Sequence, residues 1–467
     1  MDAGTYDAVI IGAGMSGLVC GCYLAKAGMK VLIVEKHNKP GGYCTSFRRQ
    51  GFTFDAAAHS MGGCKHGILG KVFSDLEIER KLRLLRFDPS NIVITPKLKI
   101  SFWSKLDKTI SEFQIVFPEE RDNIEKFIQF LIKPDPANLM SIRNWTFKRL
   151  LDQFFNNDVL KAIFSVPLGG YTGLPSSRIS AFLGLGIFKE SILDGGYYPD
   201  GGMQALSNAL VEILRGHGGE LRLSSLAKRI KVKDNIVTGV VLETDGFIKS
   251  KFVISACDAR QTFLELIRKE FVKNQFLVDI ENMIPSASMF ILYLGMNEAF
   301  NTALEPRANL WFLSHTTSGD EYFSLKNPNV DEINEYLMHL SPDKKSIVAL
   351  RFAPFKNKQY WEDNKIKWQE SFIKKIESNA IPEISKFIQY RETATPHTLQ
   401  RYTFNYNGAA FGWAGLPTQL TIPDFRKPSF IRGLYLTGHW TTHGLGIPGV
   451  AYVGYDTAKT ILKKKFI

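Results

Sequence analysis

Three glycines near the start of the chain have the spacing of a nucleotide-phosphate site. Gly12, Gly14 and Gly17 follow a short apolar run at residues 7–11 and lead into a helical pattern that ends at Gly28. The first glycine permits a tight turn, the second lets backbone approach a pyrophosphate, and the third lets the helix pack on the strand. The free N–H groups of that helix then bind the phosphates. We therefore predict that this segment binds a dinucleotide.

An acidic residue extends this pattern. A second apolar run, residues 31–34, ends at Glu35 and Lys36. A carboxylate at this point of a strand–helix–strand unit accepts hydrogen bonds from a ribose diol. Spaced glycines alone are weak evidence because glycine-rich turns are common, so the flanking strands and Glu35 make the prediction specific.

Three further glycine-rich stretches lie far apart in the sequence. They are Gly41-Gly42, Gly201-Gly202 and residues 444–449. A glycine pair just after the ribose acid indicates backbone passing close to a bulky ligand, although a plain turn is the alternative. A nicotinamide enzyme needs mainly the first site, whereas a long cofactor that crosses a domain uses several.

Composition restricts the class of protein. A chain of 467 residues, 45% hydrophobic and 22% charged, is globular and long enough for two domains. The net charge of +12 favours an anionic partner. We find no motif that reads RNA or DNA, so we expect no nucleic acid. A membrane surface remains one interpretation, and a well-solvated basic surface is the other.

Cysteine usage and hydropathy suggest a compartment. The five cysteines show no metal-ligand spacing, so we expect no metal and reduced thiols in a cytoplasmic protein. The first apolar run is the nucleotide-binding strand itself rather than a signal peptide. No apolar run reaches the roughly 18 residues that would span a membrane.

The chain alternates between two kinds of segment. A meander of three strands, at residues 221–232, 236–243 and 247–256, lies in a nucleotide-type segment. An amphipathic aromatic stretch at residues 145–164 is either an interfacial membrane helix or a buried core stripe. We predict a first domain made of three segments and a second, aromatic-rich domain made of two, namely residues 1–96, 193–284 and 427–467, and residues 97–192 and 285–426.

Together these features resemble two-domain FAD flavoproteins, and among them the phytoene desaturase, carotenoid isomerase and retinol saturase family. The resemblance covers nearly the whole chain and depends on PGG, GFTFD, YPDGGMQAL, ISACDAR and LTGHWTTHGLGIPGV. It implies an α/β fold: a Rossmann-like FAD-binding domain with an interleaved α+β substrate domain. The implied cofactor is FAD, held non-covalently because no motif assigns a Cys or His linkage.

The resemblance also implies roles for single residues. Gly12, Gly14, Met15 and Ser16 would hold the pyrophosphate and Glu35 the adenosine ribose. Ala227, expected at the end of the first meander strand, would contact the adenine through its backbone. The full implied cofactor-binding set is Gly12, Gly14, Met15, Ser16, Gly17, Glu35, Lys36, Gly42, Tyr43, Ala227, Gly438, His439, Gly446, Ile447, Pro448 and Val450.

Two positions depart from the family, and one helix has a mechanistic role. Related flavoproteins often have an acid where this chain has His439, and many have arginine where it has Tyr43. The helix that starts near Gly446 would direct its N-terminus at the pyrimidine edge of the flavin. Its dipole would stabilise the negative charge of the reduced flavin. A capped helix without that role is the alternative.

Three histidines are candidates for proton transfer. His59 follows GFTFDAAA, and His439 and His443 lie in the C-terminal glycine-rich loop, so we expect all three to converge on one site. A neutral histidine titrates at about pH 6.5 and can act as acid or base. We take His59 as the candidate catalytic residue and expect His439 to bind the cofactor. The alternative is that each only hydrogen-bonds to cofactor or backbone.

We therefore predict an FAD-dependent oxidoreductase acting on C–C or C=C bonds of a long hydrophobic polyene or isoprenoid-like substrate by hydride transfer at flavin N5. Desaturation, saturation and isomerisation all fit, because the flavin supplies the chemistry. The aromatic sections would form a tunnel, and the cytoplasmic protein would dock peripherally on a membrane. One alternative is an amine-oxidase-like flavoprotein that oxidises a C–N bond. The other is a non-catalytic isoprenoid-binding chaperone.

Overall fold

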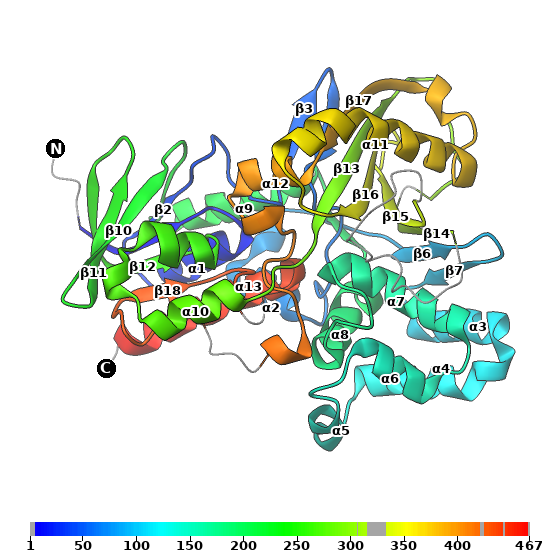
Figure 1. Cartoon of the computed structure of the whole chain (residues 1–467), viewed down its shortest axis with the longest axis horizontal. Helices are drawn as coiled ribbons and strands as arrows, with labels where there is room; N and C mark the ends of the chain where they lie inside the picture. Colours follow the sequence, from blue (N-terminus) through cyan, green and yellow to red (C-terminus); the bar gives the residue numbers. More distant parts are fainter. Residues whose placement is uncertain (1–4, 306, 315–332, 421–424, 442–443, 466–467) are drawn as a thin grey trace.

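A computed structural model describes residues 5–305, 307–314, 333–420, 425–441 and 444–465. Within these residues the chain forms two seven-stranded sheets and two short two-stranded sheets. Figure 1 shows the two large sheets side by side along the longest axis of the molecule, with a group of helices below the second sheet. The first sheet carries the turn with Gly12, Gly14 and Gly17, and aromatic side chains enter the cores on both faces of the second sheet.

The first sheet is built on the two apolar runs near the N-terminus. β1 (Tyr6–Ile11) pairs in parallel with β2 (Val31–Val34), and both are buried on both faces, as continuous apolar strands of a parallel sheet are. The strand order is β10-β11-β12-β1-β2-β9, and β18 also pairs with β12. The remaining strands are β9 (Glu220–Arg222), β10 (Ala227–Lys233), β11 (Ile236–Leu242), β12 (Phe247–Ser255) and β18 (Leu434–Leu436).

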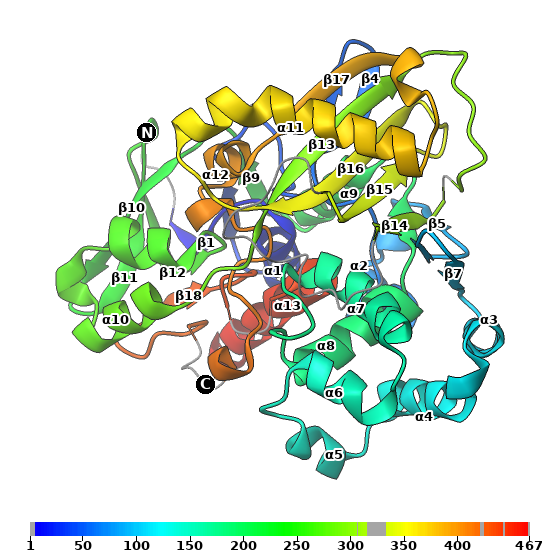
Figure 2. The same cartoon turned by 45° about the vertical axis from the view of Figure 1, so that its right-hand side comes forward.

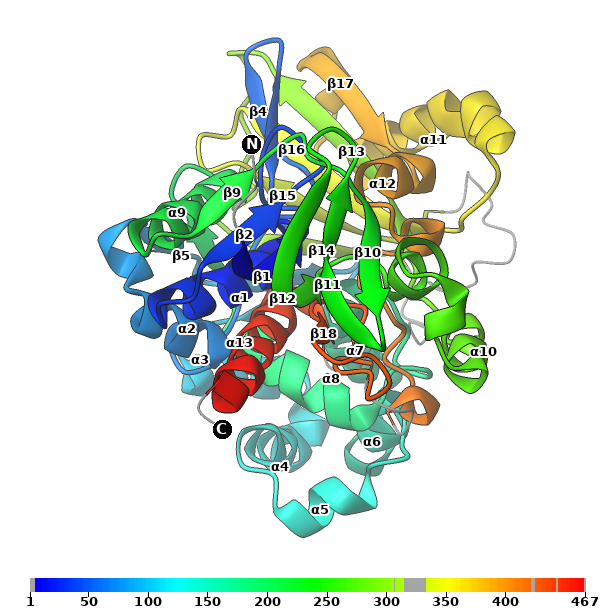
Figure 3. The same ribbon diagram turned by 90° about the vertical axis from the view of Figure 1, so that its left-hand side faces the viewer.

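Four helices cover one face of this sheet and share a buried hydrophobic cluster with it. Among them, α13 runs beside α1 (Figure 3). Close approach requires glycine at their contacts. A Cβ on Gly17 would lie 2.1 Å from the carbonyl oxygen of Gly12, and one on Gly454 would lie 2.5 Å from that of Ser16. The helices are α1 (Met15–Lys26), α2 (Ile68–Leu76), α9 (Met203–Gly216) and α13 (Gly446–Lys465).

The meander differs from its prediction at its first strand. Residues 221–232 form two strands instead of one, because Ser224 adopts a left-handed φ of 52° that ends β9. β9 pairs in parallel with β2, and β10 begins at Ala227 before pairing antiparallel with β11. The prediction that Ala227 ends a meander strand is therefore wrong: it begins one.

The second sheet has the order β17-β13-β16-β15-β14-β6-β7. Helix α11 (Lys358–Asn379) lies across one face of it (Figure 2), where Trp361, Trp368 and Phe372 enter the core. The strands are β6 (Asn91–Ile94), β7 (Lys99–Phe102), β13 (Ser288–Met296), β14 (Asn309–Leu313), β15 (Glu335–Leu340), β16 (Ser346–Ala353) and β17 (Ile388–Ala394).

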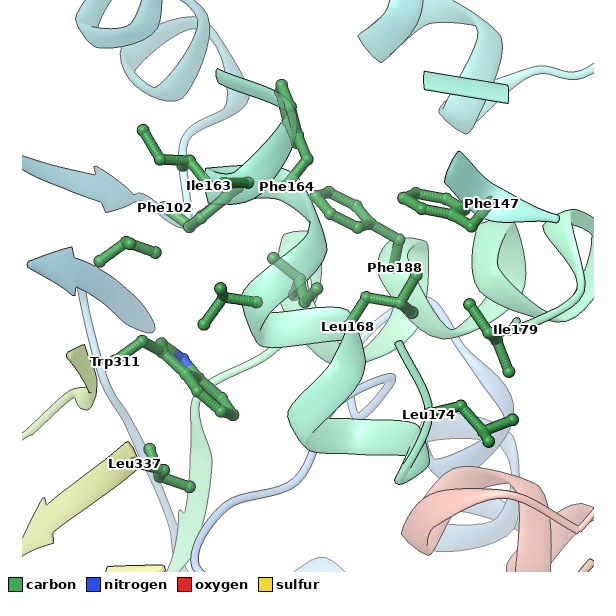
Figure 4. Packing of buried hydrophobic residues seen from close by; sticks show 14 of the residues in the cluster. Phe102, Phe147, Ile163, Phe164, Leu168, Leu174, Ile179, Phe188, Trp311 and Leu337 are labelled. Carbon is green, nitrogen blue, oxygen red and sulfur yellow. The ribbon is translucent and has the colours of Figure 1, made fainter. Parts of the chain in front are cut away.

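A helical section covers the other face of the second sheet. Its aromatic rings form a core: Phe127 and Phe164 are fully buried with ring centroids 5.0 Å apart. Figure 4 shows such rings gathered around α7, with Trp311 reaching it from β14. The helices are α3 (Leu106–Val116), α4 (Arg121–Ile132), α5 (Pro136–Ser141), α6 (Phe147–Phe154), α7 (Asp158–Thr172) and α8 (Ala181–Ile187).

This packing selects between the two interpretations of residues 145–164. The stretch is two helices, because Asn157 caps α7 by accepting the Leu160 N–H at 3.1 Å. The apolar side of both helices faces the core, since Phe147, Leu151 and Phe164 are buried. The buried core stripe is therefore observed. That the aromatic sections form a substrate tunnel stays a prediction. Among the described residues, no helix is long and apolar enough to span a membrane.

Smaller elements connect the two sheets. β3 (Ser46–Arg49) and β4 (Phe52–Asp55) form a hairpin, and β5 (Leu84–Arg86) pairs with β8 (Tyr197–Pro199). Two more helices, α10 (Asn274–Asn282) and α12 (Pro396–Thr403), lie in the connecting segments. β6 belongs to the predicted first segment, residues 1–96, but it pairs with β14 in the second sheet. The five-segment division remains a prediction about folding units.

Candidate functional site

The candidate site lies where parallel strands of the first sheet end. β1, β2, β12 and β18 run in one direction, so Gly12, Glu35, Ala256 and Thr437, which follow their last residues, lie at one edge. Ligands of open α/β sheets bind at this carboxyl edge. Gly14 forms an isolated bridge with Gly41, which brings the second glycine stretch to the first.

Gly14 and Gly17 have different surroundings. A Cβ on Gly14 would meet no heavy atom within 4 Å, whereas one on Gly17 would meet backbone at 2.1 Å. Gly17 is thus required for packing, while Gly14 borders open space. Gly14 is also the N-cap of α1, with no side-chain cap and no acid in the first turn, so the helix N–H groups can bind an anion.

The residues after Gly14 meet the C-terminal loop. Met15 and Ser16 are buried, and the Ser16 hydroxyl lies 2.5 Å from that of Thr437. Gly438 has a φ of 96°, and the nearest atom to a Cβ placed on it would be the Cβ of Ser16, at 3.7 Å. The structure therefore brings the Gly438 turn to the start of α1, as the predicted phosphate site requires.

The Glu35 carboxylate is held in place by backbone donors. It is 8% exposed and accepts the N–H groups of Ala13 at 2.8 Å and His37 at 3.0 Å. The Glu35 carbonyl accepts the N–H of Ser225 at 2.8 Å, which brings the start of β10, and with it Ala227, beside the end of β2. Glu35 and Ala227 are therefore neighbours, as an adenosine site needs.

Lys36 does not point into solvent. Its Nζ lies 3.2 Å from the centre of the Phe404 ring and donates to the Arg401 carbonyl at 3.3 Å. Burial lowers the pKa of Lys36 to about 8, while Glu35 and Cys257 raise it. Its ammonium packs on the aromatic ring of a segment that follows α12.

Tyr43 joins a hydrogen-bonded group that sequence reasoning missed. Its hydroxyl donates to the Ala409 carbonyl at 3.0 Å and lies 3.4 Å from the side-chain nitrogen of Asn405. The indole N–H of Trp440 donates to Asn405 Oδ1 at 2.9 Å. The sequence offered two signals for this group. Asn405 is a polar residue within an aromatic stretch, and Tyr43 stands where many related proteins have arginine. A Cβ on Gly42 would lie 3.4 Å from Gly14 Cα, so this loop passes close to the phosphate turn.

His439 contacts its neighbours through its backbone as well as through its ring. Its carbonyl accepts the Trp413 N–H at 3.2 Å, and its ring centroid lies 6.2 Å from that of Tyr43. Burial lowers the pKa of His439 to about 4, so the ring is neutral at neutral pH. A neutral hydrogen-bonding group thus stands where related proteins often have a carboxylate.

The predicted flavin edge lies at the start of α13. The helix begins at Gly446, which has a φ of 66°, and Pro448 lies in its first turn. Ile447 and Val450 pack against the core of the first sheet, so the helix start is anchored. His443 lies outside the described residues.

His59 and His439 belong to different side-chain clusters. The His59 ring packs 6.3 Å from those of Tyr171 and His339, and its Nδ1 lies 3.2 Å from the Ala57 carbonyl. Burial lowers the pKa of His59 to about 4. The two clusters meet through backbone, because the Ala58 N–H donates to the Tyr43 carbonyl at 3.4 Å.

Asp55, in the GFTFD motif, has an organising role that its motif did not reveal. It accepts the hydroxyls of Ser46 and Tyr198 at 2.6 Å each and the N–H of Met203 at 2.9 Å. Burial raises the pKa of its carboxyl group, while these donors lower it. Asp55 thereby ties β4, β8 and the start of α9 together, which fixes the segment leading to His59.

The model of one protein family matches this chain. Residues 15–462 match the family described as flavin containing amine oxidoreductase. The all-trans-retinol 13,14-reductase of Danio rerio is 25% identical, over 92% of this chain and 82% of its own length. The 4,4'-diapophytoene desaturase of a Methylomonas species is also 25% identical, over 99% of this chain and 96% of its own.

Solved structures share the fold at lower identity. An oxidoreductase from Methanosarcina mazei has a TM-score of 0.69 and 17% identity, covering 98% of this chain and 99% of its own. Cyclohexylamine oxidase from Brevibacterium oxydans has a TM-score of 0.65 and 14% identity, covering 99% of this chain and 100% of its own. These likenesses extend over the whole two-sheet architecture.

Proposed function

The chain belongs to the flavin containing amine oxidoreductase family and is an FAD-dependent oxidoreductase. From this premise we propose that it changes C–C or C=C bonds of a long, apolar polyene or isoprenoid-like substrate. The relatives that support this proposal are a retinol reductase, matched over 82% of its length, and a diapophytoene desaturase, matched over 96%. FAD, when bound, supplies the hydride exchange, and the chain's residues bind, orient and exclude water.

The observation that carries the cofactor assignment is the open space at Gly14. It lies at the uncapped N-terminus of α1, beside Gly42 and Gly438, where a diphosphate would meet N–H groups. Glu35 would hold the adenosine ribose, with Ala227 and Lys36 beside the adenine. Tyr43 and His439 would border the ribityl chain.

We assign the pyrimidine edge of the flavin to the first turn of α13. Gly446, Ile447, Pro448 and Val450 would present backbone and the positive end of the helix dipole there. His59 is our candidate for contact with the substrate. Because burial lowers the pKa of His59 to about 4, the ring acts as a neutral hydrogen-bonding group rather than a reservoir of protons at neutral pH.

The solved amine oxidase is only 14% identical and shares the fold alone, so neither alternative function gains a specific observation. An amine substrate is a cation, and the ring of Trp413, a residue whose backbone N–H donates to the His439 carbonyl, already has a guanidinium near it. Arg260 lies 3.9 Å from the centre of the Tyr406 ring and 5.2 Å from that of Trp413. A second cation beside it would be repelled. The chaperone interpretation, which needs no flavin, has no support from this family.

Anaerobic mixing of the FAD-loaded protein with polyenes tests the proposal. Bleaching of the oxidised flavin by a polyene identifies desaturation, and reoxidation of the reduced flavin by a polyene identifies saturation. A change in double-bond geometry without net oxidation identifies isomerisation. Mass spectrometry of lipids extracted from the purified protein names the natural substrate. If amines bleach the flavin and polyenes leave it unchanged in all three assays, the C–N alternative replaces the proposal.

We also propose that the protein works in the cytoplasm and docks peripherally on membranes, where an apolar substrate resides. The net charge of +12 supports attraction to anionic lipid. Ile115 on α3 is 76% exposed and Met140 on α5 is 68% exposed, so the helical section offers apolar side chains to such a surface.

A further inference from the structure

A row of buried polar residues crosses the second sheet at β6, β14 and β15. Asn309 on β14 pairs with Asn91 on β6. Leu310 pairs with Met338, so Asn309 and His339, the next residues along β14 and β15, come opposite each other. Residues opposite each other in neighbouring strands share a face, and here it is the face of Trp311 and Leu337, which join the core beneath the helical section.

Side chains from two other parts of the chain meet this row. The Asn309 side-chain nitrogen donates to the hydroxyls of Ser60 and Tyr171 at 2.8 Å each. The indole N–H of Trp311 donates to Asn91 Oδ1 at 2.9 Å, which fixes the orientation of that amide. Ser60 follows β4, and Tyr171 lies on α7, so the group joins the cofactor-side segment, the helical section and the sheet.

Several polar atoms of this group are buried without a partner in the described part of the chain. They are Asn309 Oδ1, His59 Nε2 and both ring nitrogens of His339, one of which lies near the Ala308 backbone but outside hydrogen-bond geometry. Asn309 is fully buried and His339 is 4% exposed. Buried polar groups in proteins nearly always have a hydrogen-bond partner, so a cluster of exceptions indicates a partner that the chain does not supply.

The protonation states specify that partner. Nδ1 of His59 faces the Ala57 carbonyl and therefore carries the proton, which makes Nε2 an acceptor. Asn309 Oδ1 is an acceptor as well, because the amide nitrogen serves Ser60 and Tyr171. A neutral His339 offers one donor and one acceptor. The matching group donates one hydrogen bond and accepts another.

The cluster is uncharged, which excludes ionic ligands. Burial lowers the pKa of His339 to about 3; His59 lowers it further, whereas the Ala308 backbone raises it. Phe87 and Tyr198 pack against the His339 ring at 5.8 and 5.7 Å. The nearby Asp55 carboxylate already holds three donors. A carboxylate or an ammonium here would be buried without a counterion, at high cost.

We propose that the cluster formed by His59, Asn309 and His339 binds a hydroxyl group on the substrate. The inference rests on the proposed function and deepens it: the substrate is a polyene alcohol rather than a hydrocarbon or an acid. The hydroxyl donates to Asn309 Oδ1 or His59 Nε2 and accepts from His339. Because these residues join the sheet to the segment after β4, they would fix how far the polyene chain extends toward the cofactor.

Binding to the FAD-loaded protein tests the proposal with three matched ligands. They are all-trans-retinol, its methyl ether, and the hydrocarbon in which hydrogen replaces the hydroxyl. Binding is followed by the change in the visible spectrum of the flavin. We expect the alcohol to bind at least about tenfold more tightly than the ether, which cannot donate, and than the hydrocarbon.

Two variants locate the preference. In His339→Phe we expect the preference for the alcohol to disappear while hydrocarbon binding is kept. Of the polar contacts of this imidazole, the substitution removes only its approach to the Ala308 backbone, and it places a ring beside Phe87 and Tyr198. Tyr336→Phe is the matched control, because it removes a buried, unpartnered hydroxyl on the opposite face of the same strand. We expect it to keep the preference.

The outcomes separate this inference from the proposed function. Equal binding of alcohol and hydrocarbon by the unaltered protein means that the cluster holds only water, and it overturns the inference while the polyene function stands. No spectral change with any of the three ligands overturns both. If His339→Phe contains FAD and keeps the full preference, the hydroxyl binds elsewhere. Since the ligand comparison needs no variant, a variant that fails to fold leaves the test intact.

Discussion

The two sheets of this protein form their sites differently: the first sheet uses backbone and the second uses side chains. At the first sheet, Gly14, Gly42 and Gly438 leave backbone open at the ends of parallel strands, and few side chains intervene. At the second sheet, Asn309, His339 and their neighbours meet from separate strands and segments as side chains. A backbone site depends on local turns, whereas a side-chain site depends on register between distant strands. The first kind can therefore be recognised in a sequence and the second cannot.

The largest expected effect separates glycines needed for the cofactor from glycines needed for the fold. Gly14→Ala should give a folded protein with roughly tenfold less bound FAD or lower, because the new methyl enters the space for the pyrophosphate. Gly17→Ala should instead lower the unfolding free energy by about 1–3 kcal/mol, because its methyl meets the Gly12 carbonyl. The ratio of flavin absorbance to protein absorbance and denaturant unfolding measure the two effects.

Acid precipitation of the unaltered protein is the control for that ratio. It should release all the yellow chromophore, as non-covalent FAD requires. Equal flavin content in Gly14→Ala and the unaltered protein would remove Gly14 from the cofactor site.

His59 and His439 extend the comparison, because His439 lies at the cofactor site of the first sheet and His59 lies beside the polar cluster of the second sheet. We expect His439→Ala to weaken FAD binding by about tenfold through the loss of one buried contact, about 1.4 kcal/mol. His59→Ala should keep its flavin and lose about tenfold in the rate of flavin reduction or product formation, because the substrate loses a hydrogen-bonding partner. Flavin content is measured before rate in both. A full rate in flavin-loaded His59→Ala would show that His59 has no role in the reaction.

Acid should destabilise the second sheet through its buried imidazole. The pKa of His339 is lowered to about 3 in the folded protein, so the unfolded chain binds the proton at higher pH. Its contribution is fully present above about pH 6.5 and is lost as pH falls toward 3. Between pH 6.5 and 5 the loss from this group is about 2 kcal/mol.

Comparing His339→Phe with the unaltered protein isolates that contribution. His59 and His439 act in the same direction, and Asp258, whose pKa burial raises to about 6, acts oppositely, but all three are present in both proteins. Unfolding free energies at pH 7 and pH 5, measured with saturating FAD, should fall less in His339→Phe. Identical pH dependence in the two proteins would mean that His339 is not held neutral by burial.

The smallest expected effect concerns the outer surface of the helical section. Flotation with anionic liposomes should recover more protein at low salt than at high salt, because each Lys or Arg near the surface contributes about 1 kcal/mol. Ile115→Ser should reduce recovery, and the control Ile366→Ser, at an isoleucine on α11 that is also exposed, should not. Negligible binding at both salt concentrations would favour a substrate delivered by another protein.

The sequence predicted the first sheet well because its elements are local. The apolar runs, the glycine turn and the C-terminal helix lie where the patterns placed them, since each is defined by neighbours within a few residues. It failed at residues 221–232, where Ser224 turns the chain and β9 pairs with β2 instead of joining the meander. That pairing depends on a strand almost two hundred residues away, which no local pattern contains.

What the sequence alone determined is the class of the protein: the glycine spacing, Glu35 and the motifs that follow lead to FAD and an oxidoreductase. The tertiary structure decided which side chains meet. It placed Asn405 against Tyr43, made the Phe127 and Phe164 rings a core, and aligned Asn309 with His339. Glycine carries its conformational freedom wherever it stands in a chain. A buried asparagine or histidine gains its meaning only from the partners that the fold brings to it, or leaves out.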